Sequence, residues 1–387
     1  MNTKDFLLRV AVPCPLYRSF DYLPPADCKT EPLPGVRVQV PFGRQKLVGV
    51  LLETTTQTDV PRDKLRPASA VLDEKPLLDS SLMQLGRWAA AYYQHPIGEV
   101  FNQLLPGLLR QGHAAAPIGE VRWRLRANAI TPDAEKSLNR APRQRQILEQ
   151  LRKIPAGLPP SQLANASQAL RALRDKGLVE RVTVTAKPEL NSAQPGPALN
   201  PAQQQAVTAI TGQNGHFHAF LLDGVTGSGK TEVYLQAIRA VLAQGKQALV
   251  LVPEISLTPQ TLARFRERLG VALAVLHSGL SDGERHNAWL AAKQGDVRVV
   301  VGTRSAVWTP LPELGLIVID EEHDSSYKQQ EGFLYSARDI AVLRAQRASC
   351  PIVLGSATPA LESLHNVANK RYQHLHLPER AGQAAHP

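Results

Sequence analysis

The sequence predicts a multidomain protein with a β-rich N-terminal domain, a winged helix, and an α/β domain with a parallel sheet and a phosphate-binding loop. Three observations support this prediction. At 387 residues, the chain is too long for one ordinary core. Its positive charge is concentrated in one segment, and its strands become uniformly apolar after about residue 200. The expected domains are 1–110, 118–187 and 200–387, with 188–199 as a linker.

Composition indicates an intracellular protein with a polyanionic partner. The formal net charge is +10 and the pI is about 9.6. Nucleic acid is the commonest polyanion, and a merely basic soluble surface is the alternative. In the N-terminal run "MNTKDFLLRVAVPCP", the apolar stretch is too short and the acidic Asp5 comes too early for a signal peptide, and no stretch elsewhere approaches the roughly 18 apolar residues of a membrane span. The scattered, odd-numbered cysteines exclude a disulfide framework or a zinc ligand set and fit a reducing cytoplasm; they are Cys14, Cys28 and Cys350.

The first segment is predicted to be a β domain followed by helices. The runs "LLRVAVP", "FDYLP" and "GVRVQVPFGRQKLVGVLLETT" alternate in part between apolar and polar residues, with Pro and Gly at the breaks. One helix is expected after the capping candidates Asp79, Ser80 and Ser81. A second, "GEVFNQLLPGLLR", should be kinked or ended by Pro106.

The middle segment is predicted to be a winged helix. Three helices are expected, in "APRQRQILEQLRK", "PPSQLANAS" and "QALRALRDKGLVERVTVTAK". The third carries Leu170, Leu173 and Leu178 near helical spacing and runs into an alternating strand. A generic three-helix bundle is the alternative. Residues 121–187 hold 14 Lys and Arg against 5 Asp and Glu, which favours DNA as the ligand.

The last segment is predicted to be an α/β domain, reached through the stiff, exposed, Pro-rich linker. Short apolar strands alternate there with amphipathic helices, which indicates a parallel sheet covered on both faces. Functional sites then lie at the carboxyl ends of the strands. The strands are predicted in "HAFLLD", "QALVLVP", "ALAVLH", "VRVVVGT", "GLIVID" and "PIVLGSATP".

A phosphate-binding loop follows the first of these strands. The stretch "DGVTGSGKTEVY" fits G-x-x-x-x-G-K-[ST], in which glycines let backbone N–H groups approach phosphate oxygens. Lys230 is expected to reach the β- and γ-phosphates, and Thr231 to coordinate Mg²⁺. The predicted ATP-binding residues of the loop are Gly224, Val225, Thr226, Gly227, Ser228, Gly229, Lys230 and Thr231.

An acidic pair ends another strand, in "GLIVIDEEH". Asp320 is predicted to hold Mg²⁺ and Glu321 to orient and deprotonate the attacking water, so that with Lys230 they are the candidate catalytic residues. A solvated turn is the alternative for an isolated acidic pair. Glu322 is expected to be exposed, and His323 is a candidate sensor of nucleotide state.

Gln203, in "LNPAQQQAVTAI", precedes the first strand of this domain. Its amide offers both a donor and an acceptor, which suits an adenine edge. The alternative is a polar residue at the start of a helix. We expect adenine recognition, which completes the predicted ATP site.

The ordered set "GVTGSGKT", "LVPEISLTPQ", "VVVGTRSAVW", "VIDEEH" and "GSATPALES" resembles motifs I, Ia, Ib, II and III of a superfamily 2 helicase. With "LYRSFDYLPP" and "VPFGRQ" near the N-terminus, the chain is similar over essentially its whole length to the PriA family of replication-restart helicases. The matches are much longer than a bare phosphate loop. The resemblance implies a 3′ DNA-end-binding domain in 1–110 and a RecA-like helicase lobe in 200–387.

The resemblance assigns a 3′-end pocket to the N-terminal domain. Phe20 would stack on the terminal base and Asp21 would accept the hydrogen of the free 3′-hydroxyl. Gly43 matches the same pocket, and Arg66 stands where the family is expected to have a basic residue. A core phenylalanine beside a turn aspartate is the alternative.

The segment "DSSYKQQEGFLYSARD" resembles the aromatic-rich loop that couples single-stranded DNA binding to ATP hydrolysis in this family. Its aromatic side chains are expected to be exposed stacking faces, and its basic ones to neutralise phosphates. The residues concerned are Tyr327, Phe333 and Tyr335, with Lys328 and Arg338.

Other strand ends are assigned roles by resemblance as well. Arg304 and Ser305 of "GTRSA", and the loop "PEISLTPQ", are expected to touch the DNA backbone. Ser356 and Thr358 of "GSATP" are expected to form a hydroxyl relay between the ATP site and DNA, with His323 as the third coupling residue.

The function implied by the resemblance is ATP- and Mg²⁺-dependent 3′ to 5′ unwinding of DNA at stalled or abandoned replication forks, followed by primosome assembly. Expected partners are forked and single-stranded DNA, primosome proteins, a helicase loader and single-stranded-DNA-binding protein, in the bacterial cytoplasm at the nucleoid and away from membranes. The sequence stops before a second RecA-like lobe and before the family's cysteine-rich zinc module, so no zinc ligands are expected here. Because loss of the second lobe's arginine costs about 10³ to 10⁵ in rate, we expect weak ATP binding, little hydrolysis and no unwinding by this chain alone.

Two other functions remain open at this stage. A non-catalytic fork-binding module would bind DNA without ATPase stimulation by single strands. A P-loop kinase with an attached DNA-binding domain would transfer phosphate to a small acceptor, but the "DEEH" and "GSATP" stretches are helicase features and no acceptor pocket is evident.

Overall fold

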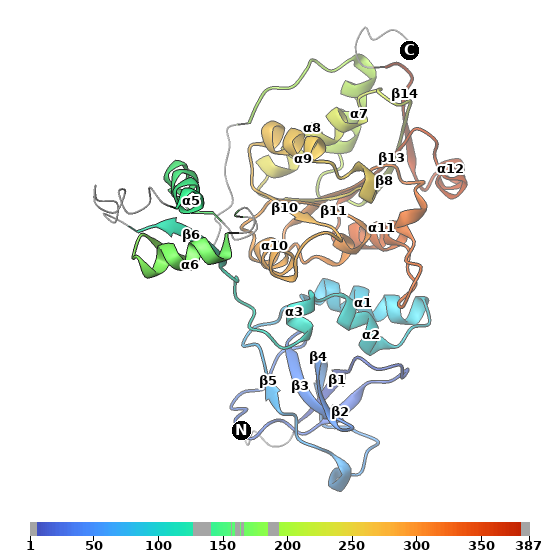
Figure 1. Ribbon diagram of the computed structural model, residues 1–387. Coiled ribbons are helices and arrows are strands. Elements are labelled where there is room, and N and C mark those ends of the chain that lie inside the picture. The colour runs from blue at the N-terminus through green and yellow to red at the C-terminus, as the bar shows by residue number, and fades with distance from the viewer. Residues whose placement is uncertain are drawn as a thin grey trace. The chain divides into compact units, whose positions relative to one another are not determined.

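The computed structural model describes residues 6–126, 141–155, 157–158, 163, 166–184 and 193–380. The chain forms two compact units, one from Met1–Ala116 with Pro188–Pro387 and one from Pro117–Lys187 (Figure 1). The larger unit contains both the N-terminal β domain and the α/β domain. The smaller unit is inserted between them in the sequence.

A five-stranded sheet in the order β2-β1-β4-β3-β5 forms the N-terminal domain. Leu8 and Val10 of β1 are fully buried in its core, as the predicted alternation requires. Arg9, which lies between them in the sequence, is opposite Asp21 of β2 and Glu53 of β4. The strands pair antiparallel and are β1 (Leu7–Ala11), β2 (Phe20–Tyr22), β3 (Arg37–Phe42), β4 (Gln45–Thr55) and β5 (Ala70–Val71).

Helices follow this sheet, as predicted. Asp79 caps the first by accepting a hydrogen bond from the N–H of Leu82 at 2.8 Å. Pro106 separates the last two because its ring cannot continue a helix. The backbone N–H of Ser336 in the α/β domain donates to the hydroxyl of Tyr93 at 3.2 Å, at the end of the first helix. The helices are α1 (Ser80–Tyr92), α2 (Ile97–Gln103) and α3 (Gly107–Arg110), and their apolar residues share one core with the α/β domain.

The α/β domain contains a seven-stranded sheet in the order β10-β11-β9-β12-β13-β8-β14, in which every pairing is parallel. All predicted strands are present. They are β8 (His218–Gly224), β9 (Gln247–Leu251), β10 (Leu273–Leu276), β11 (Val299–Gly302), β12 (Leu314–Ile319), β13 (Pro351–Ser356) and the additional β14 (Gln373–Leu377).

Helices cover both faces of this sheet (Figure 1). Ala248 and Val250 of β9 belong to the core under α7, α8 and α9, whereas Leu249 and Leu251 belong to the core under α10 and α11. Both faces being buried explains why the strands are uniformly apolar in sequence. The helices are α7 (Pro201–Thr211), α8 (Lys230–Ala243), α9 (Pro259–Leu269), α10 (Asp282–Gln294), α11 (Ala337–Arg347) and α12 (Leu361–Ala368).

The edge strand β14 was missed in the sequence. Its run "QHLHL" has only two apolar residues, Leu375 and Leu377, which are buried against the α7–α9 side of the sheet. His374 and His376 alternate with them and are exposed. An edge strand with one solvated face shows this period-2 alternation. A run of only five residues is too short for the alternation to predict a strand from the sequence.

The smaller unit packs α5 (Pro142–Lys153) and α6 (Ser167–Asp175) against two antiparallel strands, β6 (Glu120–Leu125) and β7 (Val179–Val184). Leu170 and Leu173 lie on α6 as predicted, whereas Leu178 follows the helix, and all three are buried in the core of the unit. The predicted strand after the third helix is β7, and its partner β6 precedes the first helix. The short helix predicted in "PPSQLANAS" lies mostly outside the described residues.

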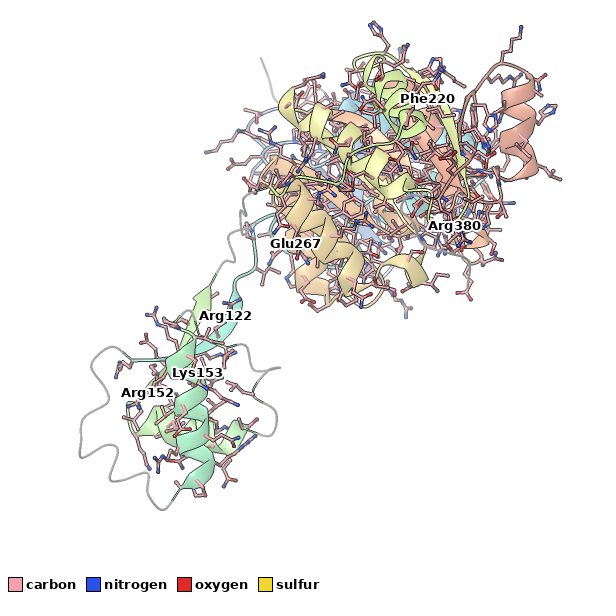
Figure 2. The ribbon with its side chains drawn as sticks, turned by 90° about the horizontal axis from the view of Figure 1, so that it is seen from above. Arg122, Arg152, Lys153, Phe220, Glu267 and Arg380 are labelled. Carbon is pink, nitrogen blue, oxygen red and sulfur yellow. The ribbon has the colours of Figure 1, made fainter. Side chains whose placement is uncertain are left out.

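Basic side chains project from this unit, and Figure 2 shows Arg122, Arg152 and Lys153 among them. Arg152 and Lys153 occupy the last turn of α5 and are exposed. The described part of the predicted linker, 193–199, has no regular secondary structure and is mostly exposed, as expected. None of the helices in the described part of the chain is long and apolar enough to cross a membrane.

Candidate nucleotide and nucleic-acid sites

The predicted phosphate-binding loop joins β8 to α8. Gly227 and Gly229 have φ angles of +83° and +85°, a region that glycine occupies without strain. Gly229 caps the N-terminus of α8, so the first N–H groups of that helix are available to an anion. Lys230 Nζ donates to the carbonyl oxygen of Gly224 at 2.8 Å, and Ser228 Oγ is buried without a partner among the described residues. These donors fit a triphosphate.

The two predicted Mg²⁺ ligands lie together. Thr231 and Asp320 line one cavity of about 110 Å³. Asp320 directly follows β12, and its N–H donates to the carbonyl of Leu251 at 2.9 Å. Burial raises the pKa of Asp320, as does the neighbouring Glu321, against the lowering effect of nearby donors. A hydroxyl and a carboxylate at one small cavity are the oxygen ligands that Mg²⁺ prefers.

Tyr234 is a residue of this site that sequence reasoning missed. Its hydroxyl donates to Asp320 Oδ1 at 3.0 Å. Burial, followed by the charge of Asp320, raises the pKa of Tyr234 well above its ordinary value, so the phenol remains a donor. A Cβ on Gly355 would collide with this hydroxyl, which explains the glycine of "GSATP". The signal was the spacing of four residues from Lys230, which puts both side chains on one helix face.

The predicted coupling residues come together at the same strand ends. His323 Nδ1 lies 2.7 Å from Ser356 Oγ and 3.6 Å from Glu321 Oε2. The backbone N–H of Thr358 donates to Ser356 Oγ at 2.9 Å. Thr358 thus contacts Ser356 through its backbone, whereas the predicted relay used its hydroxyl. Glu321 has a φ of +46°, which is uncommon for a residue with a Cβ and typical of functional turns.

The expected exposure of one charged residue near this site was wrong, and a second charged residue is paired with it. Glu322 is 1% exposed rather than solvated. Its carboxylate accepts from Arg338 Nη1 at 3.0 Å, from Ser363 Oγ at 2.8 Å and from the N–H of Ala360 at 2.7 Å. Arg338 was predicted to bind phosphate, but its side chain is 14% exposed and paired with this buried carboxylate. Arg338 therefore anchors the end of the loop instead.

Gln203 also has a different position from that expected. Its residue is 3% exposed, and with Asn200 it forms a capping box at the start of α7. The amide oxygen accepts from the N–H of Asn200 at 3.0 Å, and Nε2 donates to the carbonyl of Ser228 at 2.8 Å. These two bonds use one lone pair of the amide oxygen and one N–H of Nε2, so the second of each is left for an adenine edge, and recognition of adenine by Gln203 stays a prediction. The spacing N-x-x-Q was a capping signal in the sequence.

The aromatic residues after the acidic pair are buried, not exposed. Tyr327, Phe333 and Tyr335 are 2%, 6% and 3% exposed. The hydroxyl of Tyr327 donates to the carbonyl of Asp320 at 2.6 Å. Phe333 stacks on Tyr335 with ring centroids 5.0 Å apart and meets the edge of Tyr93 from the N-terminal domain. As folded here, none of the three offers a face to a nucleobase, and the expected exposure is wrong.

Basic and polar residues around this loop remain partly accessible. Lys328 is exposed. Arg304 is half-buried, and its Nη1 donates to the carbonyls of Ser326 and Lys328 at 3.1 and 2.9 Å, so it holds the loop backbone. Ser305 lines a cavity of about 340 Å³. In the loop "PEISLTPQ", Ile255 is 83% exposed.

The N-terminal domain brings its predicted DNA-end residues into one pocket. Phe20, Asp21, Gly43 and Arg66 all line a cavity of about 690 Å³. Gly43 has a φ of +60°, which turns the chain between β3 and β4 and leaves open space beside it. An aromatic ring, a carboxylate and a basic side chain thus face one pocket, although 46 residues of sequence separate Phe20 from Arg66.

Sequence reasoning missed the residues that position this pocket. Arg9 donates to both oxygens of Asp21, at 2.9 and 3.2 Å, and its hydrogen bond to Asp21 raises the pKa of the guanidinium. Phe42 meets Phe20 edge to face at 5.2 Å, and Arg18 lies over the Phe20 ring at 4.9 Å. Arg9 and Asp21 lie opposite each other on adjacent strands. Their contact could be predicted from the sequence only if the register between β1 and β2 were known.

Comparisons with known proteins identify related domains in two regions of the chain. Residues 9–106 match the family model described as "3'DNA-binding domain (3'BD)", and residues 200–367 match "DEAD/DEAH box helicase". The structure of RecG bound to a three-way DNA junction aligns with 50% of this chain and 25% of that one, with a TM-score of 0.37 and 21% identity.

Curated relatives of this chain have the name replication restart protein PriA. The one from Haemophilus influenzae is 42% identical over 98% of this chain and 52% of its own length. The Bacillus subtilis protein is 34% identical over 96% of this chain and 55% of its own length. The Synechocystis protein is 50% identical over 56% of this chain and 27% of its own length. The chain spans about half the length of the first two relatives. By these matches the chain belongs to the PriA family of replication restart proteins, and its α/β domain is a helicase lobe.

Proposed function

We propose that this chain supplies fork recognition and the first motor lobe of an ATP-dependent 3′ to 5′ DNA helicase that restarts replication. The observation that carries the proposal is the hydrogen bond from Tyr234 to Asp320, which brings the phosphate-loop helix and the acidic pair together. A DNA-end pocket in the same chain supports it. The name of the relatives supports the role in restart.

In this proposal, the residues of the lobe divide the work of ATP hydrolysis. Lys230 and the N–H groups at the start of α8 hold the phosphates, and Thr231 and Asp320 hold Mg²⁺. Bound Mg²⁺ neutralises charge on the transferring phosphoryl group. Glu321, half-exposed at the strand end, orients and deprotonates water. His323 and Ser356 transmit the state of this site toward the DNA-binding surface.

The N-terminal pocket is proposed to capture the 3′ end of a nascent strand. Phe20 would stack on the terminal base, with Arg18 above the ring adding charge near the backbone. Asp21 keeps lone pairs free beyond those bound by Arg9, so it can accept the hydrogen of a 3′-hydroxyl. Arg9 fixes the orientation of that carboxylate before the strand arrives.

The smaller unit is proposed to bind duplex DNA through its exposed basic residues, by phosphate contacts whose affinity falls with salt. Primosome proteins, a helicase loader and single-stranded-DNA-binding protein are the proposed protein partners. These partners are proposed from the family relationship and concern the activity of the full-length protein.

Nucleotide binding and hydrolysis test the motor assignment. Lys230→Ala should weaken binding of a fluorescent ATP analogue at least tenfold, because a charge-assisted contact is lost. Lys246→Ala, at an exposed lysine paired with Glu313, is the matched control and should bind as the wild type does. Equal binding by both variants would remove Lys230 from the site. Absence of ATP-analogue binding by the wild type would favour a fork-binding module without a motor.

Fork binding tests the DNA-end assignment. Two model forks differ only in the leading strand, which ends in a free 3′-hydroxyl or in a 3′-phosphate. Fluorescence anisotropy should show roughly tenfold tighter binding to the free end. Asp21→Ala should remove this preference, and Asp63→Ala, at an exposed carboxylate outside the pocket lining, should keep it. Equal affinity of the wild type for both forks would contradict end recognition.

A further inference from the structure

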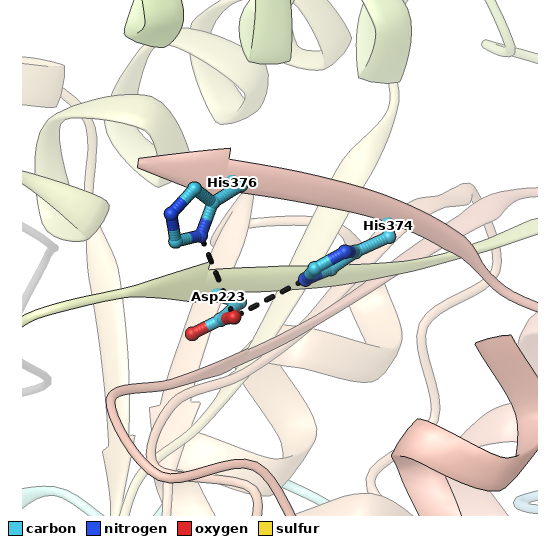
Figure 3. Close-up of side chains that lie close together, drawn as sticks. All are labelled: Asp223, His374 and His376. Carbon is cyan, nitrogen blue, oxygen red and sulfur yellow. Dashed lines mark hydrogen bonds and ion pairs between the residues drawn. The ribbon is translucent and has the colours of Figure 1, made fainter. Parts of the chain in front are cut away.

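A second cluster of side chains lies at the edge of the helicase-lobe sheet, separate from the ATP site. It consists of Asp223, His374 and His376 (Figure 3). His374 Nε2 is 3.2 Å from Asp223 Oδ2, and His376 Nδ1 is 3.5 Å from the same oxygen. Within the described ranges of the chain, this is the only group of three or more histidine, cysteine and carboxylate side chains whose ligand atoms all lie within 4.8 Å of one another.

The fold explains why these residues meet. β14 pairs parallel with β8, and the register sets His376 beside Asp223 and His374 beside Leu221. Leu375 and Leu377 alternate with the histidines and enter the α7–α9 core, so both imidazoles lie on the opposite face of β14. Asp223 alternates with Leu222, which belongs to the same core, so its carboxylate emerges on the histidine side. Figure 3 shows the two rings directed toward the carboxylate.

We propose that Asp223, His374 and His376 bind one divalent transition-metal ion of the Zn²⁺ class. Ligand atoms at 2.0 to 2.1 Å from a tetrahedral ion are about 3.3 to 3.4 Å apart, close to both separations from Asp223 Oδ2. Two imidazoles and one carboxylate suit Zn²⁺, Co²⁺ or Ni²⁺, whereas Mg²⁺ prefers an all-oxygen shell. The side chains of His374 and His376 are 39% and 55% exposed, so an ion has access and solvent completes its coordination.

The site differs from a cysteine-based zinc module in both ligands and location. Its carboxylate comes from the residue immediately before Gly224, the first glycine of the phosphate-binding loop. The carbonyl of Gly224 accepts from Lys230, and β14 ends beside Gly224 at Leu377. An ion shared by the two strands therefore holds the edge strand β14 to the strand that enters the loop. The inference does not depend on the proposed helicase activity.

Metal binding by the whole chain tests this proposal. After dialysis against chelator, Zn²⁺ is titrated by isothermal calorimetry in excess Mg²⁺, which occupies oxygen-rich sites, and Co²⁺ binding is followed by its visible absorption bands. One equivalent should bind to the wild type. His374→Gln and His376→Gln should each weaken binding about tenfold or more, because loss of even an outer-shell partner of a metal ligand costs that much. His365→Gln, at an exposed histidine of α12, should bind as the wild type does.

A second readout separates metal ligation from an ordinary ion pair. Zn²⁺ should raise the melting temperature of the wild type and the His365→Gln variant and leave that of a variant carrying both His374→Gln and His376→Gln unchanged. It should also slow amide exchange in β14. Without metal, all variants should melt alike, because exposed substitutions rarely matter to stability. The proposal is overturned if wild-type binding does not saturate, or if the His374 and His376 variants keep wild-type affinity.

Discussion

The N-terminal pocket and the loop of residues 325–338 were both predicted to contact DNA, yet they fold in opposite ways. In the pocket, Phe20, Asp21, Gly43 and Arg66 face one open cavity. In the loop, the aromatic rings are buried and Arg338 is paired with a buried carboxylate. The same residue types therefore occupy a solvent-facing site in one region and a packed core in the other.

The difference comes from what each segment meets in the tertiary structure. The pocket residues lie at the periphery of the sheet, on the edge strand β2, in the turn between β3 and β4 and in the segment before β5, where they line an open cavity. The loop meets the end of α1, where Tyr93 and His95 surround Phe333. Aromatic composition predicts a large apolar contact in both cases, and only the neighbours decide whether that contact is protein or nucleic acid.

Truncation of one ring in each region gives the largest expected contrast. Phe333→Ala should lower the free energy of unfolding by about 4 kcal/mol, because a buried aromatic side chain is replaced by a cavity. Phe20→Ala should cost about 1 kcal/mol, the value of its edge-to-face pair with Phe42, while weakening fork binding. Urea denaturation and fork anisotropy measure the two effects. Equal stability losses would show that the pocket ring is also structural.

Removal of the buried carboxylate behind the loop should have the next largest effect. Glu322→Ala leaves the largely buried Arg338 with only the more distant, exposed carboxylates of Asp339 and Glu362 and should destabilise the chain by about 3 kcal/mol. Glu362→Ala is the control, because that carboxylate is 3.9 Å from Arg338 but its side chain is 64% exposed. It should change stability by about 0.5 kcal/mol or less. Similar losses in the two variants would contradict the anchoring role of Glu322.

Arg304 should have a smaller and more local effect. Its two hydrogen bonds to loop carbonyls are partly exposed, so Arg304→Ala should cost about 1 kcal/mol. Amide exchange should become faster in residues 326–334 and stay unchanged in the N-terminal pocket. Lys328→Ala, at an exposed side chain of the same loop, should leave both regions as they are. Faster exchange in the pocket would mean that the two regions are coupled.

The fold was predicted well where local pattern decides it. The apolar strands of the lobe, the cap at Asp79 and the break at Pro106 each depend on a few neighbouring residues. β14 was missed because its alternating pattern contains only two apolar residues, both leucines, which are too few to predict a strand. The winged-helix prediction anticipated β7 but not β6 as its partner, because that pairing joins the two ends of the unit.

The site followed the same rule. The phosphate loop and acidic pair are local motifs and lie where expected. The prediction that Glu322 is exposed was wrong because its partners Arg338 and Ser363 are 16 and 41 residues away along the chain. Tyr234 and Arg9 were missed for a related reason, since each acts on a carboxylate that only the tertiary fold brings near.

The smallest expected effect concerns Asp320, whose pKa is raised by burial and by Glu321 above its ordinary value of 3.8. The folded state therefore binds the proton more tightly than the unfolded state, so ionisation of Asp320 destabilises the fold as the pH rises through the raised pKa. Asp320→Asn keeps an acceptor for Tyr234 and should slightly increase stability at neutral pH. That gain should disappear as the pH falls below 3.8, where Asp320 is protonated in both states.

Urea denaturation at several pH values measures this difference, with Asp324→Asn, at a neighbouring carboxylate in the turn, as the comparison variant. A gain in stability for Asp320→Asn at neutral pH would mean that the lobe keeps a carboxylate whose ionised form destabilises the fold but binds metal. Asp21 differs, because Arg9 donates hydrogen bonds to both of its oxygens. A loss of stability would mean instead that the charge of Asp320 is needed by Lys230 and Tyr234, and that the acidic pair holds the phosphate loop in place even before nucleotide binds.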